Sequence, residues 1–568
     1  MKRFKKICLT SILCAVLMCT NVLSTYACTA VYVGSDASDD GTTIIAKSND
    51  CQANWGNYVK ITERVENQEG RTMPVDNDQT VFATLPATTY RFTSTPWFDS
   101  TVDENGLGSD ATVCVNEYGV SMIMSITAFS NEAALKADPL IENGLSEFTA
   151  DDLVVCQSKT AREGVEVLLG LIDTYGSSEI NIAFIADQNE AWYIEMYNGH
   201  QYAAVKLPSD MVSVFGNEFL LEYVEDYEDY IVSDNLESLA KDNGFAVYDE
   251  NGRLNLLKTY SGDEVLYNYS HMRTWIGHQI LAGGYDEYNK EDVYPLTFKA
   301  NDKVSITDVF EILRNRFEGT EYSPDETGRT DMRVIGTDTA LSVHAVQIYK
   351  DLPADYACVT WESTGPALYG LFVPISNGAT SISEPYSLNQ SIEEDDVFDT
   401  SYPYYLFKAL NTLCVDQSTY KIYGVPVREY FQKAEQGMTS TLAQVLQNAK
   451  ELSDEDAKEY ITNYCNSVQQ KAFDDAGQLL NDVFWYMCEN SNTMKNGRNP
   501  ETGEAYREVK EIDPLTVELD PSGYSVIPEV KKGESADTSA NMLPVYIGVG
   551  VLALAFALMI VKKNKTEK

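Results

Sequence analysis

Hydrophobic and polar positions in the first part of the chain follow the pattern of β-strands separated by turns. β-Branched runs occupy residues 28–34 and 42–48, and a turn-rich loop that ends in Asp40-Gly41 separates them. A helical pattern covers residues 151–175. Further strand-like runs occupy residues 180–186, 191–197, 211–215, 342–349 and 356–361. Strands mixed with helices in this way predict sheet layers that are covered by helices.

The pattern changes after about residue 390, where hydrophobic side chains recur at helical spacing. Three stripes predict helices with core-facing sides, at residues 442–452, 460–468 and 479–487. Ser453 and Asp456 form a candidate capping box before the middle stripe. We therefore predict one mixed domain over residues 28–390 and a mainly helical extension over residues 391–525.

The beginning of the chain is predicted to be a targeting segment. Four basic residues precede an apolar run over residues 7–22, and the small residue Ala27 stands directly before Cys28. This combination predicts a signal peptide over residues 1–27 that is removed from the mature protein.

The end of the chain is predicted to be a membrane anchor. Residues 543–561 contain no charged residue, and a helix of this length rises roughly 28 Å, close to the hydrocarbon thickness of a bilayer. Lysines follow at once, which predicts a cytoplasmic tail at residues 562–568. A polar stalk over residues 526–542 would hold an extracellular domain away from the cell membrane. A buried core helix is the alternative interpretation of the apolar run.

The composition narrows the class of protein. Of 568 residues, 44% are hydrophobic and 23% are charged, which is typical of a globular protein rather than a disordered one. The formal net charge of −44 excludes nucleic acid as a partner, because so acidic a surface repels phosphate. Eleven cysteines are present, and their wide scatter predicts no disulfide framework.

The familiar hydrolytic and metal-binding motifs are absent from the sequence. It has four histidines, none in a His-Glu-x-x-His pair, and it contains neither a Gly-x-Ser-x-Gly elbow nor a Cys-x-x-Cys pair. We therefore expect no metal and no organic cofactor. A catalytic nucleophile in this chain would need its base from another source.

Removal of the predicted signal peptide would provide such a base at Cys28. The residue would then carry an α-amine, with a pKa near about 7.7–8.0, beside a thiol with a pKa near about 8.5. Proton exchange between these groups is nearly isoenergetic at neutral pH, so one residue can supply both nucleophile and base.

Two other interpretations of Cys28 compete with catalysis. A cysteine at a signal junction can be the lipid-modified residue of a lipoprotein, although Thr25 and Tyr26 fit that signal poorly. A C-terminal span would also make a second anchor redundant. Cys28 can instead be an ordinary disulfide cysteine at the start of a strand. Position alone does not separate these alternatives.

Six short motifs follow one another from the predicted mature N-terminus onwards. The first is CTAVYVGSDASDDGTTIIAKSND at residues 28–50. The others are VNEYGV at 115–120, WYIEMYNGHQYAAVKLP at 192–208, GNEF at 216–219, YSHMRTW at 269–275 and SVHAVQI at 342–348. In this order the motifs resemble the dipeptidase A family, cysteine dipeptidases within the acylase-like N-terminal-nucleophile hydrolases. The resemblance favours a catalytic Cys28.

The resemblance implies roles for five residues. Cys28 is the nucleophile and, through its amine, the base, and Asp50 is the carboxylate that lies near this amine. Asn217 contributes its side-chain amide to the oxyanion hole, and Arg273 supports the site electrostatically. Lys47 stands where the family usually has arginine, so it keeps the positive charge but loses the bidentate fork.

The resemblance also implies a fold and a reaction. The expected fold is an α/β (α+β) four-layer αββα sandwich, with two antiparallel sheets between helices. The second oxyanion donor comes either from around residues 125–127 or from the backbone. The expected reaction is hydrolysis of short peptides, chiefly dipeptides. An N-acyl amide hydrolase of the penicillin V or bile-salt acylase type is the nearest alternative. A non-catalytic, surface-anchored binding protein is the other.

Overall fold

The computed structural model describes residues 28–50, 56–97, 111–262, 268–389 and 398–490, followed by 494–498, 500–503, 505–509 and 512–529. Contacts divide the chain into residues 1–528 and residues 529–568, and all elements below belong to the first unit. The predicted signal peptide and the predicted membrane span lie outside the described residues, so both stay predictions. No helix in the described ranges is long and apolar enough to cross a membrane.

A six-stranded antiparallel sheet carries the start of the described chain. Its strand order is β12-β1-β2-β14-β15-β16, so the β1–β2 hairpin lies between strands from much later in the chain. The bounds are β1 Ala30–Val33, β2 Thr43–Asp50, β12 Val212–Phe215, β14 Ala340–Ile348, β15 Cys358–Thr364 and β16 Val373–Ser376. All of these strands except β16 cover runs that the hydrophobic pattern predicts as strands.

An eight-stranded antiparallel sheet forms the second layer, in the order β13-β11-β10-β9-β8-β7-β6-β3. Its β9 and β10 pair as the hairpin predicted at residues 180–186 and 191–197. The bounds are β3 Lys60–Thr62, β6 Phe92–Pro96, β7 Ala111–Asn116, β8 Ser121–Ile123, β9 Asn181–Ala186, β10 Ala191–Met196, β11 Tyr202–Lys206 and β13 Tyr230–Val232. A separate small hairpin joins β4 (Thr72–Pro74) to β5 (Phe82–Thr84).

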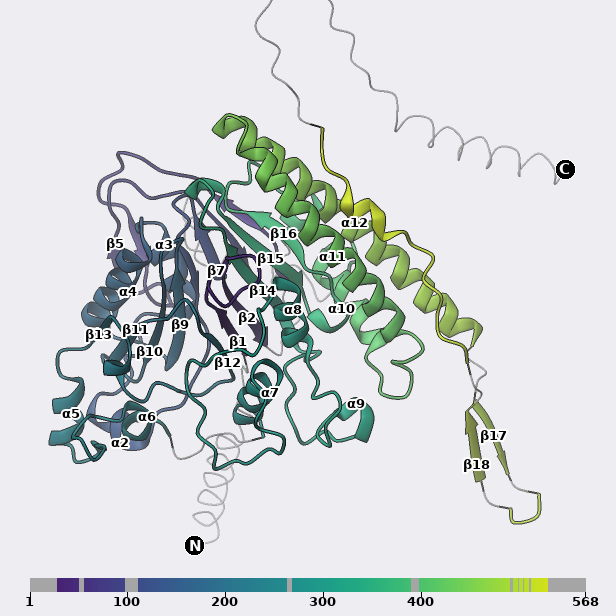
Figure 1. Cartoon of the computed structure of the whole chain (residues 1–568), viewed down its shortest axis with the longest axis horizontal. Coiled ribbons are helices and arrows are strands. Elements are labelled where there is room, and N and C mark those ends of the chain that lie inside the picture. The colour runs from purple at the N-terminus through teal and green to yellow at the C-terminus, as the bar shows by residue number, and fades with distance from the viewer. Residues whose placement is uncertain are drawn as a thin grey trace, which may run out of the picture. The chain divides into compact units, whose positions relative to one another are not determined.

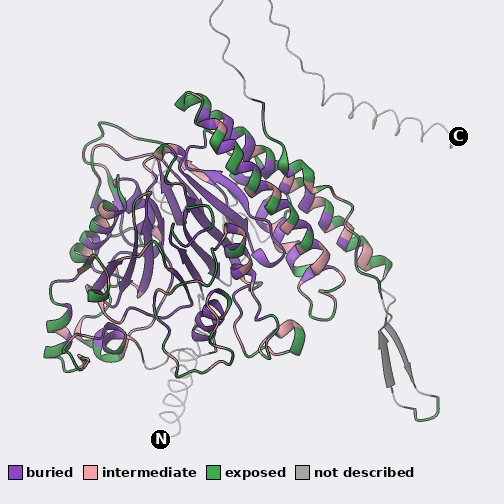
Figure 2. Cartoon of the chain, in the orientation of Figure 1, coloured by how far each residue is buried: buried purple, intermediate pink, exposed green. Residues whose placement is uncertain are grey.

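The two large sheets lie against each other, and helices cover their outer faces (Figure 1). β2 contacts β8 across the interface between the sheets. α3 (Glu147–Val155) and α4 (Ala161–Tyr175) pack on the eight-stranded sheet. α7 (His271–Leu281) and α8 (Ile306–Arg314) pack on the six-stranded sheet. The strands between these helices are buried almost throughout (Figure 2), so the predicted mixed α/β layers are confirmed.

The helix predicted over residues 151–175 is wrong in detail, because the structure has two helices there. α3 ends at Val155, and α4 begins after Thr160. Thr160 caps α4 by accepting a hydrogen bond from the Glu163 N–H at 3.1 Å. A threonine side chain that caps a new helix competes with continuation of the preceding one.

The helical region consists of α10 (Pro403–Cys414), α11 (Gly424–Ala449) and α12 (Asp454–Glu489). The second and third predicted stripes lie in one helix, α12, so a separate third helix is wrong. Only Gly477 would weaken the helix between the stripes, and a single glycine costs about 1 kcal/mol, which burial of the flanking side chains offsets. Of the predicted capping box at Ser453, the cap itself is confirmed, since Ser453 Oγ accepts from the Asp456 N–H at 3.3 Å, and the reciprocal hydrogen bond stays a prediction.

The helical region packs directly on the edge of the six-stranded sheet. Gln469 of α12 donates from Nε2 to the carbonyl of Pro374 in β16 at 2.9 Å. Arg314 of α8 forms an ion pair with Glu435 of α11, at 2.5 Å, and both side chains are buried. Side chains of α10–α12 belong to the same hydrophobic core as the sheet. A domain boundary at residue 390 stays a prediction.

The remaining elements are short. They are α2 Glu132–Ala137, α5 Leu236–Asp242, α6 Leu256–Tyr260, α9 Pro324–Thr327, β17 Met494–Arg498 and β18 Ala505–Val509. The β17–β18 hairpin lies within the segment predicted to be mainly helical.

Candidate active site

Cys28 lies two residues before the first residue of β1, beside the end of β2, and it is fully buried. The Thr29 N–H donates to Ser48 Oγ at 3.0 Å, and the Ser48 N–H donates to the Thr29 carbonyl at 2.9 Å. The thiol of Cys28 lies 3.9 Å from Asn49 Oδ1. The register of the β1–β2 hairpin therefore brings the last residues of β2 to the thiol.

The environment of Cys28 determines how easily its thiol ionises. Burial raises the pKa of the Cys28 thiol, because a buried thiolate loses its hydration. The ammonium of Lys47 lowers this pKa, and the carboxylate of Asp50 raises it. Lys47 is therefore a cation that favours the thiolate, which is the reactive form.

Arg273 joins Cys28 to Asn217. It lies in the first turn of α7 and is fully buried, so it is not a surface cation. Its Nη1 donates to the Cys28 carbonyl at 2.6 Å and to Thr29 Oγ1 at 2.8 Å, and its Nη2 donates to Asn217 Oδ1 at 2.7 Å. Burial lowers the pKa of Arg273 to about 10, so the guanidinium stays charged at neutral pH.

Asn217 follows β12 and spans the gap to the other sheet. Its Nδ2 donates to the Thr127 carbonyl at 2.7 Å. A side-chain amide has two N–H donors, so this hydrogen bond engages one of them. The segment after β8 contains Ser125, whose φ of 68° lies in the left-handed region that a non-glycine residue rarely adopts. Strained backbone thus lies in the segment from which the sequence predicts the second oxyanion donor.

Asp50, the last residue of β2, is fully buried and forms an ion pair that the sequence does not predict. Its Oδ2 lies 3.2 Å from Nη2 of Arg333. Burial raises the pKa of the Asp50 carboxyl, while the charges of Arg333 and Arg273 lower it. Arg333 stands alone in a loop without periodicity, so no sequence signal distinguishes it from other surface arginines.

Lys47 lies on the other face of β2, since it is three positions before Asp50 and side chains alternate along a strand. It is fully buried, and its Nζ donates to the Met124 carbonyl at 2.6 Å. Its strand partner His344 is also fully buried. Burial and the nearby Lys47 charge hold the pKa of His344 well below its ordinary value, so this imidazole is neutral.

Glu195 anchors the loop that carries Asn217, a role that the sequence does not predict. Its carboxylate accepts hydrogen bonds from the hydroxyls of Tyr193 and Tyr197, at 2.6 and 2.9 Å. It also accepts from the N–H groups of Leu220 and Leu221, at 2.8 and 3.1 Å. Burial raises the pKa of Glu195 to about 7, although these four hydrogen bonds oppose the shift.

The structure thus brings together all five residues that the resemblance assigns to the site, namely Cys28, Lys47, Asp50, Asn217 and Arg273. On one side of Cys28, Arg273 binds its carbonyl and links it to Asn217, and the Arg273 charge acts on Asp50; on the other side, the charge of Lys47 acts on the thiol. Among the residues that the structure describes, no cluster of His, Cys, Asp or Glu side chains has the arrangement of a metal site.

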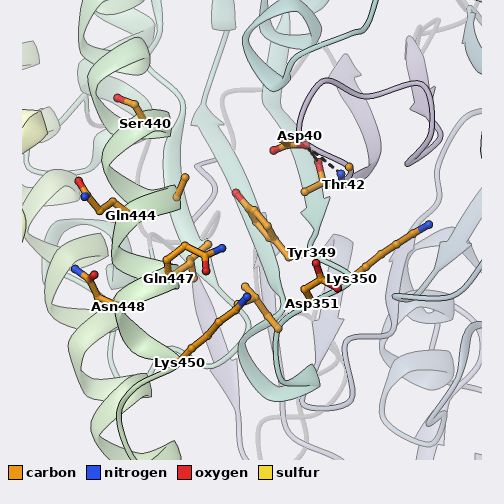
Figure 3. A pocket seen from close by; sticks show the side chains of 14 residues that line it. Asp40, Thr42, Tyr349, Lys350, Asp351, Ser440, Gln444, Gln447, Asn448 and Lys450 are labelled. Atoms are coloured by element: carbon orange, nitrogen blue, oxygen red, sulfur yellow. Dashed lines mark hydrogen bonds between the residues drawn. The ribbon is translucent and has the colours of Figure 1, made fainter.

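A cavity of about 640 Å³ lies elsewhere, between α11 and the sheet (Figure 3). Asp40 lines it on one side, and Gln444 and Lys450 line it on the other. Tyr349, which also lines it, follows the end of β14 and is roughly 20 Å along this strand from Ser342, the partner of Asn49. This cavity is separate from the site at Cys28.

Comparison with known proteins agrees with the motifs. The profile of peptidase family C69 matches residues 27–433. A probable dipeptidase B of Lactococcus lactis is 30% identical over 473 residues, which cover 80% of this chain and 94% of that protein. A probable dipeptidase B of Streptococcus pyogenes is 28% identical over 377 residues, 64% of this chain and 74% of that protein.

A solved structure gives a much weaker match. A mutant of conjugated bile acid hydrolase from Clostridium perfringens aligns with 59% of this chain and 89% of its own, with 9% identity and a TM-score of 0.29. The family match and the dipeptidase relatives confirm the resemblance that the six motifs indicate, and they make this chain a peptide hydrolase. The chain belongs to peptidase family C69.

Proposed function

We propose that this chain is a cysteine dipeptidase whose mature N-terminal residue is Cys28. The family match begins at residue 27, next to the predicted cleavage point. Relatives that cover most of the chain carry the name probable dipeptidase. The observation that carries the proposal is the bridge made by Arg273, which binds the carbonyl of the proposed nucleophile and the side chain of the proposed oxyanion donor.

The proposed reaction begins with a proton transfer within Cys28. The thiol proton moves to the free α-amine, and the sulfur attacks the peptide carbonyl. The second N–H of Asn217 and a backbone N–H near Ser125 stabilise the negative charge on the oxygen. As the C–N bond breaks, the α-ammonium gives its proton to the leaving amine. Water then cleaves the thioester, with the amine accepting the proton of water and returning one to sulfur.

The proposal includes an architecture and a location. Two antiparallel sheets between helix layers support assignment to the αββα sandwich of N-terminal-nucleophile hydrolases. The leader at residues 1–27 and the apolar run at residues 543–561 support a peptidase that acts outside the cell on a single membrane anchor.

The first test examines the mature N-terminus. Mass spectrometry of the protein purified from membranes should show Cys28 as the first residue with an unmodified amine. The Cys28→Ala variant should fold normally but hydrolyse dipeptides at least about 10⁴-fold more slowly. A form with one glycine before Cys28 should be inactive as well, because its sulfur has no adjacent free amine. A lipid-modified or internal Cys28, or activity in Cys28→Ala, would refute the proposal.

The second test compares substrate classes. Purified ectodomain should hydrolyse dipeptides and release two amino acids, as detected by amine-reactive labelling. Penicillin V and glycine-conjugated bile acids serve as comparison substrates. Faster cleavage of either of these than of any dipeptide would replace the proposed dipeptidase with an N-acyl amide hydrolase.

A further inference from the structure

Glu147 and Asp151 form a buried acidic pair that the reaction above does not use. They lie four residues apart on α3, so their side chains share one helix face. Both are buried, with exposed fractions of 4% and 1%. Glu147 Oε2 accepts from Asn181 Nδ2 at 2.5 Å, whereas neither carboxylate oxygen of Asp151 has a hydrogen-bond partner within the described ranges. Such burial is strongly unfavourable unless another group binds the carboxylate.

Aromatic packing brings this part of α3 to the end of β2. Phe148, between the two acidic residues, packs edge-to-face on Trp97 with ring centroids 5.0 Å apart. Trp97 forms a small hydrophobic cluster with Leu341, the residue before Ser342 in β14. Ser342 is the strand partner of Asn49, whose Oδ1 lies 3.9 Å from the thiol of Cys28. The acidic pair is therefore held at the same end of the sandwich as the nucleophile.

The same charged groups act on Asp151 and on Cys28. Burial is the main cause that raises the pKa of each side chain. The Lys47 ammonium lowers both pKa values, and the Glu147 carboxylate raises both. The unpartnered carboxylate and the thiol therefore share one buried polar region.

We propose that Asp151, assisted by Glu147, binds the free α-ammonium of the first residue of a dipeptide. The proposal rests on the dipeptidase function given above. In a dipeptide the ammonium nitrogen lies about 2.5 Å from the scissile carbonyl carbon, so its binding group must lie close to the attacking sulfur. The ammonium supplies Asp151 with the charged hydrogen-bond donors that it lacks. An N-acyl amide has no cation at this position, so the same carboxylate selects against it.

The test pairs one variant with two matched substrates. Asp151→Asn keeps the size of the side chain and removes its charge. For a dipeptide with a free amine, kcat/KM should fall roughly 100-fold, chiefly through KM. For the N-acetylated form of the same dipeptide, which has the same scissile bond, kcat/KM should stay equal or rise. The preference of the wild-type protein for the free amine should thus collapse.

Asp152→Asn is the matched control, since Asp152 is the next residue and is equally buried. Its carboxylate accepts from the thiol of Cys114 at 3.4 Å, a contact that an asparagine oxygen can keep. This variant should retain the wild-type preference. If Asp151→Asn loses kcat/KM equally on both substrates, or keeps the wild-type preference for the free amine, the proposal is overturned.

Two further results distinguish a failure of this proposal from a failure of the dipeptidase function on which it rests. If the wild-type protein cleaves no dipeptide, the dipeptidase function itself fails. If it cleaves dipeptides and Asp151→Asn does not fold, competitive inhibition of the wild-type protein by alaninamide and by N-acetylalaninamide decides the matter. Inhibition by the free amine alone supports ammonium binding, and equal inhibition by both compounds overturns it.

Discussion

The two faces of β2 at Cys28 differ in how their polar groups are satisfied. On the face towards α7, Arg273 donates to Cys28, Thr29 and Asn217, and Asp50 Oδ1 is the oxygen of the named site residues there that has no hydrogen bond to the described residues. On the face towards the eight-stranded sheet, His344 has buried ring nitrogens without hydrogen bonds to the described residues, and so has the carboxylate of Asp151 on α3, on which the Lys47 charge also acts. The first face has the features of a rigid scaffold that fixes the nucleophile. The second face has the features of a binding surface that a substrate completes.

The largest expected effect comes from breaking the scaffold at Arg273. Arg273→Ala removes the bridge and leaves the Cys28 carbonyl and Asn217 Oδ1 without their donor in a buried site. We expect a loss in kcat/KM of about 10³-fold or more, close to 4 kcal/mol of transition-state stabilisation. Arg273→Lys keeps the charge but loses the fork, so it should recover little of this loss. Steady-state kinetics on a dipeptide measures the effect.

Arg314 provides a matched control for Arg273, because it is also a fully buried arginine. It binds Glu435 of α11 and the Ala367 carbonyl between β15 and β16 rather than groups at Cys28. Arg314→Ala should lower the melting temperature but leave kcat of the folded fraction unchanged. If the two variants lose kcat equally, Arg273 acts through general stability and the bridge has no special role.

Glu195 holds the loop that carries Asn217 in place, and its contribution to the stability of the protein should depend on pH. Its pKa is raised from 4.5 to about 7, so the folded protein binds this proton more tightly than the unfolded chain does. The resulting stability is complete below about pH 4.5 and is lost as pH rises to about 7. Across this window the free energy of unfolding should fall by on the order of 3 kcal/mol relative to Glu195→Gln, which does not titrate.

Urea unfolding at several pH values between 4.5 and 7.5 measures this difference. A constant difference between wild-type protein and Glu195→Gln over the whole range would contradict the expected proton uptake.

The sequence predicts the scaffold better than it predicts the binding face. The strands at residues 28–34 and 42–48 follow from β-branched runs, and their hairpin brings Cys28 to the end of β2. Arg273 and Asn217 follow from motif resemblance, because each lies within a recognisable segment. The predicted roles of these residues in catalysis stay predictions, since the structure shows their contacts and not their chemistry.

The remaining site residues could not be predicted because their roles depend on contacts between distant segments. Arg333 reaches Asp50 across 283 positions of the chain, and nothing in its own neighbourhood marks it. Asp151 has the spacing of an ordinary helix residue, and only the packing of α3 shows that its carboxylate is buried without a partner. The motif around Glu195 is recognisable, but its hydrogen bonds to Leu220 and Leu221 depend on the tertiary fold.

A substitution at Lys47 tests the face of β2 towards the eight-stranded sheet, because Lys47 acts on the pKa of the Cys28 thiol. Lys47→Met removes the cation that lowers the pKa of Cys28, so that pKa should rise and the thiolate should become scarcer. At neutral pH we expect kcat/KM to fall roughly 100-fold, with partial recovery at higher pH. The acidic limb of the pH–rate profile should therefore move to higher pH. Lys47→Arg keeps the charge and should keep the wild-type limb, and an unshifted limb in Lys47→Met would show that Lys47 does not act on the thiol.

The smallest effect is expected at Arg333, which positions Asp50 without touching the thiol. Arg333→Gln removes one of two arginines that lower the pKa of the Asp50 carboxyl, and Arg273 still opposes the effect of burial. The pKa of Asp50 should therefore rise, and Asp50 should lose its charge at a higher pH than in the wild-type protein. We expect about a tenfold loss in kcat/KM below neutral pH and little loss at alkaline pH, where Asp50 stays ionised in both proteins. Arg333→Lys should restore most of the activity, because the positive charge matters more for the pKa of Asp50 than the forked geometry of the guanidinium does. A loss that is independent of pH would instead mean that Arg333 holds its loop in place, and the ion pair would then belong to the fold rather than to the site.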